Sequence, residues 1–272
     1  CKEINLAGRF VPNNFGIGPV LRSVNSVLAP VMMSKSKPDI IHETYYSSDR
    51  FRSLRCKRVI TVHDMIHELF PNNFSLRDET KIFKYEAVKR ADHIICVSKN
   101  TQKDLVQILG VDKKKISVIY HGISVLKSEL KFNSVNIGPF ILYVGARERN
   151  YKNFSRFLEA FAKSKDLRRN FKIIAFGGGN FTFEESNTFR KMNLTDDNII
   201  HIKGTDECLA SLYNSASLFV YPSLYEGFGI PPLEAMSYGC PVACSNASSI
   251  PEVVGDAAFF FDPYSSSSIM EI

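Results

Sequence analysis

The stretch LFVYPSLYEGFGIPPLEAMSYGCPV, residues 218–242, contains an apolar strand, a glycine-containing loop and a helix in direct succession. We expect the strand to end near Ser223, and Pro231 and Pro232 are typical of a first helical turn. Gly239 suits the C-terminal cap of this helix, because glycine adopts the left-handed conformation without a steric penalty. A strand followed by a helix in this way is the building unit of a parallel α/β sheet.

The loop before the predicted helix has the chemistry of a site for a diphosphate or a sugar hydroxyl. Gly227 and Gly229 let the backbone approach a ligand closely, and the helix N-terminus offers free N–H groups with a partial positive charge. Glu226 precedes the helix and we expect Glu234 in its first turn, so both carboxylates can accept hydrogen bonds from one ligand at two depths. The alternative for Glu234 is a favourable contact with the helix dipole alone.

Short β-branched runs alternate with helix-like segments along the rest of the chain. The strand-like runs begin at Asp39, Arg58, His93 and Ile116 in the first half and at Phe140, Phe171, Ile199, Leu218 and Val242 in the second. Residues 80–90 form one of the helix-like segments between them. This alternation predicts two doubly wound parallel sheets, that is, two Rossmann-like α/β domains.

The boundary between the two predicted domains falls in a stretch of mixed charge. We expect the first domain at residues 1–126, a linker at 127–138 that ends in Gly138, and the second domain at 139–272. The chain begins with Cys1 rather than Met and stops at Ile272, so we expect both domains to be incomplete.

The composition predicts a folded protein, and we expect it to be cytoplasmic. The chain has 272 residues, of which 44% are hydrophobic and 23% charged, which is enough to bury a substantial core. Its apolar runs are far shorter than the roughly 18 residues that a membrane span requires. The six cysteines form no C-x-x-C pair, which favours reduced thiols. A metal site at Cys240 and Cys244 is the weaker alternative, because no His lies nearby.

Positive charge is concentrated in the first half of the chain. Residues 1–130 hold 21 Lys and Arg against 13 Asp and Glu, whereas residues 131–272 hold 13 against 15. The asymmetry predicts an anionic partner for the first half, either the inner surface of a membrane or a phosphorylated substrate. A solvated basic face is the alternative. We expect no nucleic acid as a partner, since no recognisable binding module accompanies the charge.

Three segments together resemble one enzyme family. Glu226 and Glu234, separated by seven residues, resemble the paired-glutamate signature of the retaining glycosyltransferase family 4, which has the GT-B fold. YVGARERNYKNF, which begins at Tyr143, resembles the segment that opens the second domain of this family, and VITVHDMIHELFP, which begins at Val59, resembles a first-domain segment. The resemblance covers nearly the whole chain and is strongest over residues 140–263. It implies two Rossmann-like domains that face each other across a cleft.

The resemblance also implies roles for individual residues. Arg147 and Lys152 match the residues that hold the donor diphosphate, and Arg149 is a rival to Arg147 for that role. Two cations there neutralise the leaving group as its charge develops, which is the main need of transfer without a metal. His63 matches the residue that reaches the donor sugar. The predicted catalytic residues are thus His63, Arg147, Lys152 and Glu226, and the predicted donor-binding residues are Gly204, Thr205, Gly227, Phe228, Gly229, Ile230 and Glu234.

Other polar residues are weaker candidates for the same cleft. Each falls near or at the end of a predicted first-domain strand: His42, Asp64, His67, Ser98 and His121. The run FGGG at residues 176–179 is not a G-x-G-x-x-G fingerprint, and we expect it to form a strand-end loop in the donor cleft.

Within the family, the sequence is most similar to bacterial mannosyltransferases that build O-antigen and related surface polysaccharides from GDP-mannose. This similarity implies retaining transfer of mannose to a glycan or lipid-linked acceptor. The sequence contains no D-x-D, so we expect no metal and no cofactor other than the nucleotide sugar. The alternatives are a catalytically silent sugar-nucleotide-binding module and a nucleotide-sugar epimerase of the same fold, although the first half shows no clear set of carboxylates for the epimerase.

Overall fold

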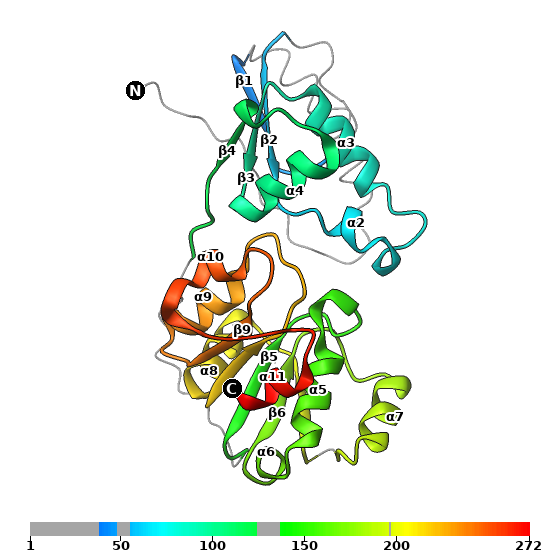
Figure 1. The fold of residues 1–272 in the computed structure, drawn as a ribbon, viewed down its shortest axis with the longest axis vertical. Coiled ribbons are helices and arrows are strands. Elements are labelled where there is room, and N and C mark those ends of the chain that lie inside the picture. Colours follow the sequence, from blue (N-terminus) through cyan, green and yellow to red (C-terminus); the bar gives the residue numbers. More distant parts are fainter. Residues whose placement is uncertain (1–37, 48–54, 124–136, 196) are drawn as a thin grey trace.

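The structure of this chain, a computed structural model, describes residues 38–47, 55–123, 137–195 and 197–272. These residues form two α/β domains that lie one above the other along the long axis of the molecule (Figure 1). The predicted linker lies outside the described residues except for Ile137 and Gly138. Within the described ranges, no helix has both the length and the apolar character required to span a bilayer.

The first domain is built on a parallel sheet with the strand order β1-β2-β3-β4. Its strands are β1 (Ile40–Glu43), β2 (Lys57–Val62), β3 (His93–Cys96) and β4 (Ile116–Val118). Its helices are α2 (Ile66–Leu69), α3 (Thr80–Arg90) and α4 (Lys99–Leu109), with 3-10 turns η1 (Pro71–Asn73) and η2 (Lys113–Lys115). Ile60 and Val62 of β2 and Ile94 of β3 are buried against α3 and α4 and are almost fully enclosed.

The second domain is built on a parallel sheet of six described strands, in the order β10-β9-β8-β5-β6-β7. The strands are β5 (Phe140–Val144), β6 (Lys172–Phe176), β7 (Ile199–Ile202), β8 (Leu218–Tyr221), β9 (Val242–Ser245) and β10 (Phe259–Phe261). The chain runs outward from β5 to β7 and then returns to β8 beside β5. In open α/β sheets, ligands bind at the carboxyl ends of the strands where the order reverses in this way.

Helices cover both faces of the second sheet, as an all-parallel sheet requires. They are α5 (Phe154–Lys163), α6 (Lys165–Asn170), α7 (Phe183–Lys191), α8 (Asp206–Ser215), α9 (Ile230–Ser237), α10 (Ile250–Val254) and α11 (Ser266–Glu271), with 3-10 turns η3 (Asn150–Lys152) and η4 (Gly255–Ala257). Strand β8 shows the two faces clearly: Val220 packs toward α5, whereas Phe219 and Tyr221 pack toward α8 and α9.

Both sheets confirm the predicted fold class. The helix predicted at 80–90 is α3 with the same bounds, and α9 carries Pro231 and Pro232 in its first turn. Gly239 follows α9 in the predicted left-handed conformation, with a φ of 74°. The position predicted for Glu234 was wrong: α9 begins at Ile230 and its first turn holds no acidic residue, so Glu234 lies just past that turn. Strand β10 was not predicted, since its three residues are all Phe and show no alternation with polar residues.

Candidate active site

Lys152 and Glu226 form an ion pair at the carboxyl edge of the second sheet. Lys152 ends η3 in the connection after β5, and Glu226 lies in the loop between β8 and α9. Because β5 and β8 are neighbours, these two loops meet, and Lys152 Nζ lies 2.7 Å from Glu226 Oε1. The two side chains retain 18% and 10% of their exposure, so the pair is mostly enclosed but reachable. An ammonium and a carboxylate here can bind a phosphate oxygen and a hydroxyl group respectively.

Two buried tyrosines surround the carboxylate of Glu226. Burial and then the charge of Glu226 raise the pKa of Tyr221 well above its ordinary value, and its hydroxyl also donates a hydrogen bond to Glu226. The pKa of Tyr143 is raised by burial and then by the same carboxylate. Both phenols therefore remain neutral, and the Lys152 ammonium also lies 5.7 Å from the centre of the Tyr221 ring. This setting keeps water away from most of the ion pair.

Arg147 is bonded to the loop after β6 and to α7. Its buried guanidinium donates through Nη1 to the carbonyl of Gly177 at 2.6 Å and through Nη2 to that of Gly179 at 2.8 Å. Its Nε donates to Glu185 Oε1 at 2.8 Å, which connects the loop to α7. Within the described residues, these bonds tie Arg147 to the strand-end loop after β6. Its role as a diphosphate ligand stays a prediction.

Arg149, the rival candidate, contacts the first domain instead. Its guanidinium donates a hydrogen bond to the backbone carbonyl of Asn73 and lies 5.2 Å from the ring of Phe74. The neighbouring amide of Asn150 donates to Asn73 Oδ1 at 2.7 Å. Of the cations predicted for the diphosphate, Lys152 is therefore the one that the structure brings to Glu226.

His63 lies at the seam between the two domains. Its Nε2 is 2.8 Å from the carbonyl of Thr44, which makes Nε2 the protonated nitrogen, and its ring stacks on His121 with the centroids 5.7 Å apart. The ring of His121 meets that of Phe228, from the second domain, edge-on at 5.3 Å. Burial and then His63 lower the pKa of His121 below its ordinary 6.5. The neutral form of His121 is thus favoured where its ring lies between those of His63 and Phe228.

The other polar candidates of the first domain make structural contacts. His42 pairs with Thr61 across β1 and β2 at 2.8 Å. Asp64 accepts a hydrogen bond from the amide of Ile66, which starts α2. His67 stacks on Phe74 and lies 3.5 Å from Asp78. Ser98 caps the N-terminus of α4.

A cavity of about 310 Å³ opens beside α8 and α9. It is lined by Gly122, Ile123, Asp206, Leu209, Ala210, Tyr213, Ile230, Glu234 and Tyr238. Glu234 accepts a hydrogen bond from the Tyr213 hydroxyl at 3.2 Å. Gly204 and Thr205, predicted to lie near the nucleotide base, directly precede Asp206 at the start of α8. The sequence analysis did not identify Asp206 and Tyr213 as residues that line this cavity. Their only local signal was their position on a helix that follows a strand.

The loop after Glu226 approaches the first domain closely. A Cβ atom on Gly227 would lie 1.8 Å from the carbonyl oxygen of His63, so glycine is required for this contact. Ser249 donates to the carbonyls of Glu226 and Phe228, both at 2.8 Å, and holds the loop from the other side. Gly229 has a φ of 106°, which is accessible to glycine, and Ile230 begins α9. The predicted donor-binding residues Gly227 to Ile230 therefore lie between the two domains.

Solved structures with the same build place the fold in the GT-B class. Sucrose-phosphate synthase (tll1590) from Thermosynechococcus elongatus matches 98% of this chain and 71% of its own, with a TM-score of 0.72 at 19% identity. A glycosyltransferase from Rickettsia africae ESF-5 matches 97% of this chain and 72% of its own, with a TM-score of 0.67 at 18% identity. Anabaena Alr3699/HepE in complex with UDP and glucose matches 92% of this chain and 71% of its own, with a TM-score of 0.68 at 20% identity.

The sequence places the chain in a family within that class. Residues 127–271 match Glycosyl transferases group 1, and residues 5–125 match Glycosyltransferase Family 4. The chain therefore belongs to the glycosyl transferases of group 1, as the paired glutamates had indicated.

Two curated relatives are mannosyltransferases by name. The O-antigen chain mannosyltransferase RfbU of Salmonella typhimurium is 30% identical over 209 residues, which are 76% of this chain and 57% of RfbU. The O-antigen chain mannosyltransferase B of Escherichia coli is 66% identical over 58 residues, which are 21% of this chain and 15% of that protein. The chain thus spans a little over half of RfbU and a smaller share of the second relative.

Proposed function

We propose that this protein transfers mannose from GDP-mannose, with retention of anomeric configuration, to a glycan or lipid-linked saccharide in surface polysaccharide synthesis. Membership of the group 1 glycosyl transferases supports the reaction class, and the names of the relatives, O-antigen chain mannosyltransferases, support mannose. The observation that carries the proposal is the Lys152–Glu226 pair at the switch point between β5 and β8.

Lys152 supplies the charge stabilisation that the reaction needs. As the bond between the sugar C1 and the phosphate oxygen breaks, negative charge grows on the leaving diphosphate, and the ammonium neutralises it. The Glu226 carboxylate then turns from Lys152 to the donor sugar and accepts a hydrogen bond from one of its hydroxyl groups. The acceptor hydroxyl attacks C1 from the side of the leaving group and gives its proton to the departing phosphate oxygen, so no protein nucleophile is required. Closure of the two domains excludes water and limits hydrolysis of the donor.

The cavity beside α8 and α9 is proposed to hold the nucleoside. Glu234 on α9 is an acceptor for ribose hydroxyls, and Asp206 is an exposed carboxylate that lines the same cavity from α8. Guanine presents two adjacent donors, N1–H and the N2 amino group, whereas uracil presents one N–H. A carboxylate with two acceptor oxygens matches the guanine pair, which supports GDP rather than UDP as the leaving group.

Thermal unfolding with GDP-, UDP- and ADP-sugars tests the donor, since a ligand that binds the native state raises the unfolding temperature. We expect the largest rise with GDP-mannose, a smaller rise in Asp206→Asn, and no change of response in Asp166→Asn, whose exposed side chain is on α6. An equal rise with UDP-glucose would contradict the choice of base.

Transfer assays test the reaction itself. We expect release of GDP coupled to a new mannoside, undiminished by a metal chelator because Lys152 and helix amides replace a metal at the diphosphate. Saturable binding of GDP-mannose without turnover at any acceptor would instead establish a silent binding module. A strict need for a divalent cation would remove the metal-independent mechanism.

The charge of the first half supports a peripheral contact with an anionic membrane at the cytoplasmic face. Residues 1–130 carry 21 Lys and Arg against 13 Asp and Glu. We expect co-sedimentation with phosphatidylglycerol vesicles at low salt, and its loss with phosphatidylcholine vesicles or when high salt screens the charges. Equal sedimentation with both lipids would exclude an electrostatic contact.

A further inference from the structure

A side chain of the second domain completes the core of the first. Tyr225 lies in the loop between β8 and α9, directly before Glu226, yet its side chain is only 6% exposed and packs in the buried cluster beneath the first sheet. Its neighbours there include Met65, and its ring centroid is 6.1 Å from that of Phe70. An aromatic residue buried across an interface is the usual anchor of such a contact.

The hydroxyl of Tyr225 makes two hydrogen bonds in the first domain. It donates to Asp104 Oδ2 on α4 at 2.6 Å and accepts a hydrogen bond from the backbone amide of Met65. Asn100 donates to the same Asp104 oxygen at 2.8 Å and holds the carboxylate in place. Burial and then the hydrogen bond to Asp104 raise the pKa of Tyr225, so the phenol remains a donor at any working pH.

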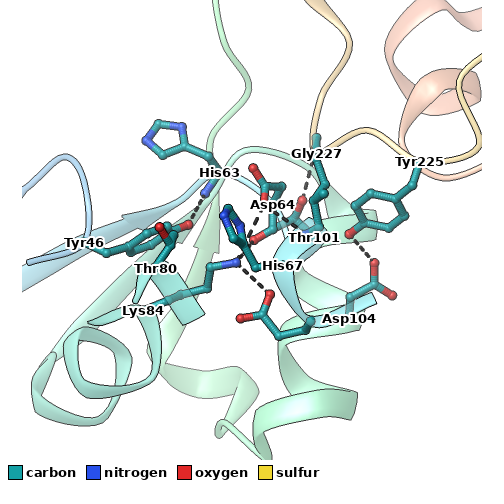
Figure 2. Close-up of polar contacts among 12 residues, drawn as sticks. Tyr46, His63, Asp64, His67, Thr80, Lys84, Thr101, Asp104, Tyr225 and Gly227 are labelled. Carbon is teal, nitrogen blue, oxygen red and sulfur yellow. Dashed lines mark hydrogen bonds and ion pairs between the residues drawn. The ribbon is translucent and has the colours of Figure 1, made fainter. Parts of the chain in front are cut away.

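The residue on the other side of Glu226 is docked as well. The buried hydroxyl of Thr101 donates to the carbonyl of Gly227 at 3.1 Å, while the Gly227 α-carbon abuts the carbonyl of His63. Figure 2 shows Tyr225 and Gly227 reaching from the second domain to Asp104 and Thr101 of the first. We call His63, Met65, Thr101 and Asp104 the socket.

The buried ammonium of Lys84 holds the segment that contains the socket residues His63 and Met65. Lys84 on α3 is fully enclosed and donates to the carbonyl of Asp64 at 2.9 Å and to Glu68 Oε2 at 2.7 Å (Figure 2 shows Lys84 beneath Asp64). Tyr46 accepts a hydrogen bond from the amide of His63 at 3.1 Å. The segment that carries His63 and Met65 is therefore held by contacts within the first domain as well as by those of the second.

We propose that Tyr225 and Asp104 are positioning residues: their contact docks the loop that carries Glu226 into the socket and so sets the Lys152–Glu226 pair in its working geometry. This inference rests on the proposed transferase function. Glu226 lies between two neighbours that are docked on the first domain, while Ser249 and Lys152 of the second domain hold it from the other side, so separation of the domains removes one of its two supports. The nucleoside cavity is lined mainly by α8 and α9 of the second domain and does not include the socket. Loss of the contact should therefore slow transfer without weakening nucleotide binding.

The test compares variants that break the Tyr225–Asp104 hydrogen bond with variants that keep it. We expect Tyr225→Phe and Asp104→Leu each to lower kcat about tenfold, the effect of one buried hydrogen bond to a charged group, with the KM for GDP-mannose within about twofold of wild type. Asp104→Asn keeps an oxygen acceptor for the Tyr225 hydroxyl and should therefore retain most of the wild-type kcat. The double variant should be slowed by less than the product of the two single effects, because both single variants remove the Tyr225–Asp104 bond. Tyr264→Phe, at an exposed tyrosine, is the matched control.

A second measurement does not depend on activity. Hydrogen exchange at the Met65 amide, which is bonded to the Tyr225 hydroxyl, should become faster in Tyr225→Phe and stay unchanged in Tyr264→Phe. If the wild-type protein transfers no mannose while Tyr225→Phe still exchanges faster at the Met65 amide, the proposed function is refuted and the docking contact stands. Unchanged exchange, or a lower unfolding temperature with an unchanged kcat for the folded enzyme, would overturn the positioning role.

Discussion

Lys152 and Glu226 are the residues on which the proposed chemistry depends most directly. We predict that Lys152→Met lowers kcat/KM by about 100-fold or more, because the charge on the leaving diphosphate loses its nearest ammonium. The measurement is initial-rate transfer from GDP-mannose. Lys163→Met is the control, since Lys163 is half exposed and pairs with Glu159 on the surface of α5. A Lys152→Met enzyme with wild-type kcat/KM would refute the assignment.

Loss of Lys84 should destabilise the fold strongly. Its side chain has no exposure, and its partner Glu68 retains 3%, so Lys84→Met would leave a buried carboxylate without a counter-charge. Removing one partner of such a pair costs about 3–5 kcal/mol. Urea unfolding should show this loss in Lys84→Met and almost none in Lys81→Met, an exposed position on α3. Equal stabilities of the two variants would exclude a structural role for the buried ammonium.

Helix α7 shows how an element end contributes to the site. The Thr182 hydroxyl accepts from the Glu185 amide, and Glu185 Oε2 accepts in return from the Thr182 amide, which is a complete capping box. The other oxygen of Glu185 holds Arg147. The cap therefore also orients the carboxylate that secures Arg147.

We predict that Thr182→Ala lowers the free energy of unfolding by about 1 kcal/mol, the usual value of an N-cap hydroxyl. Thr182→Ser, which keeps the hydroxyl, should lose much less. Chemical denaturation with circular dichroism measures both variants. If the two variants were equally unstable, the methyl group rather than the hydrogen bond would be responsible.

The strands were the elements best predicted from sequence. Buried parallel strands are short β-branched runs between helical segments, and this local pattern identified β1 to β9. Helix starts were predicted less accurately: α9 begins at Ile230, so Glu234 lies just past the first turn rather than within it. The end of a helix depends on loop contacts such as those of Gly229, which a local pattern does not contain.

At the scale of the whole molecule, Gly227 sets how closely the domains approach. In Gly227→Ala the added methyl would overlap the carbonyl of His63 and force the domains apart. We predict a fall in kcat of about 100-fold or more with nucleotide affinity within about threefold, because closure is lost while the cavity remains. Gly239→Ala, which meets no atom within 4 Å, should reduce stability through its φ of 74° but not kcat. An active Gly227→Ala enzyme would contradict the close contact.

The domain seam should also respond to pH through His121. Its pKa is lowered below the ordinary 6.5 by burial and by His63, so the unfolded chain takes up a proton at a higher pH than the folded protein does. Stability from this group is thus complete above about pH 6.5 and declines as the pH falls toward the folded pKa. The unfolding temperature of wild type should drop more than that of His121→Gln between about pH 7 and pH 5.5. Identical pH slopes would exclude His121 as the cause.

Local sequence determined the two parallel sheets and the helix behind the glutamate loop, because strand and helix periodicity is contained in neighbouring residues. The prediction of Lys152 and Glu226 came from the resemblance of short motifs to the family. Tertiary structure decided which candidates meet. It directed Arg147 to the loop after β6, brought Glu234 to the Tyr213 hydroxyl, and buried Tyr225 in the core of the first domain. The Tyr225–Asp104 bond joins residues 121 positions apart in different domains. Such a contact depends on how the two domains pack, and no spacing along one segment specifies that.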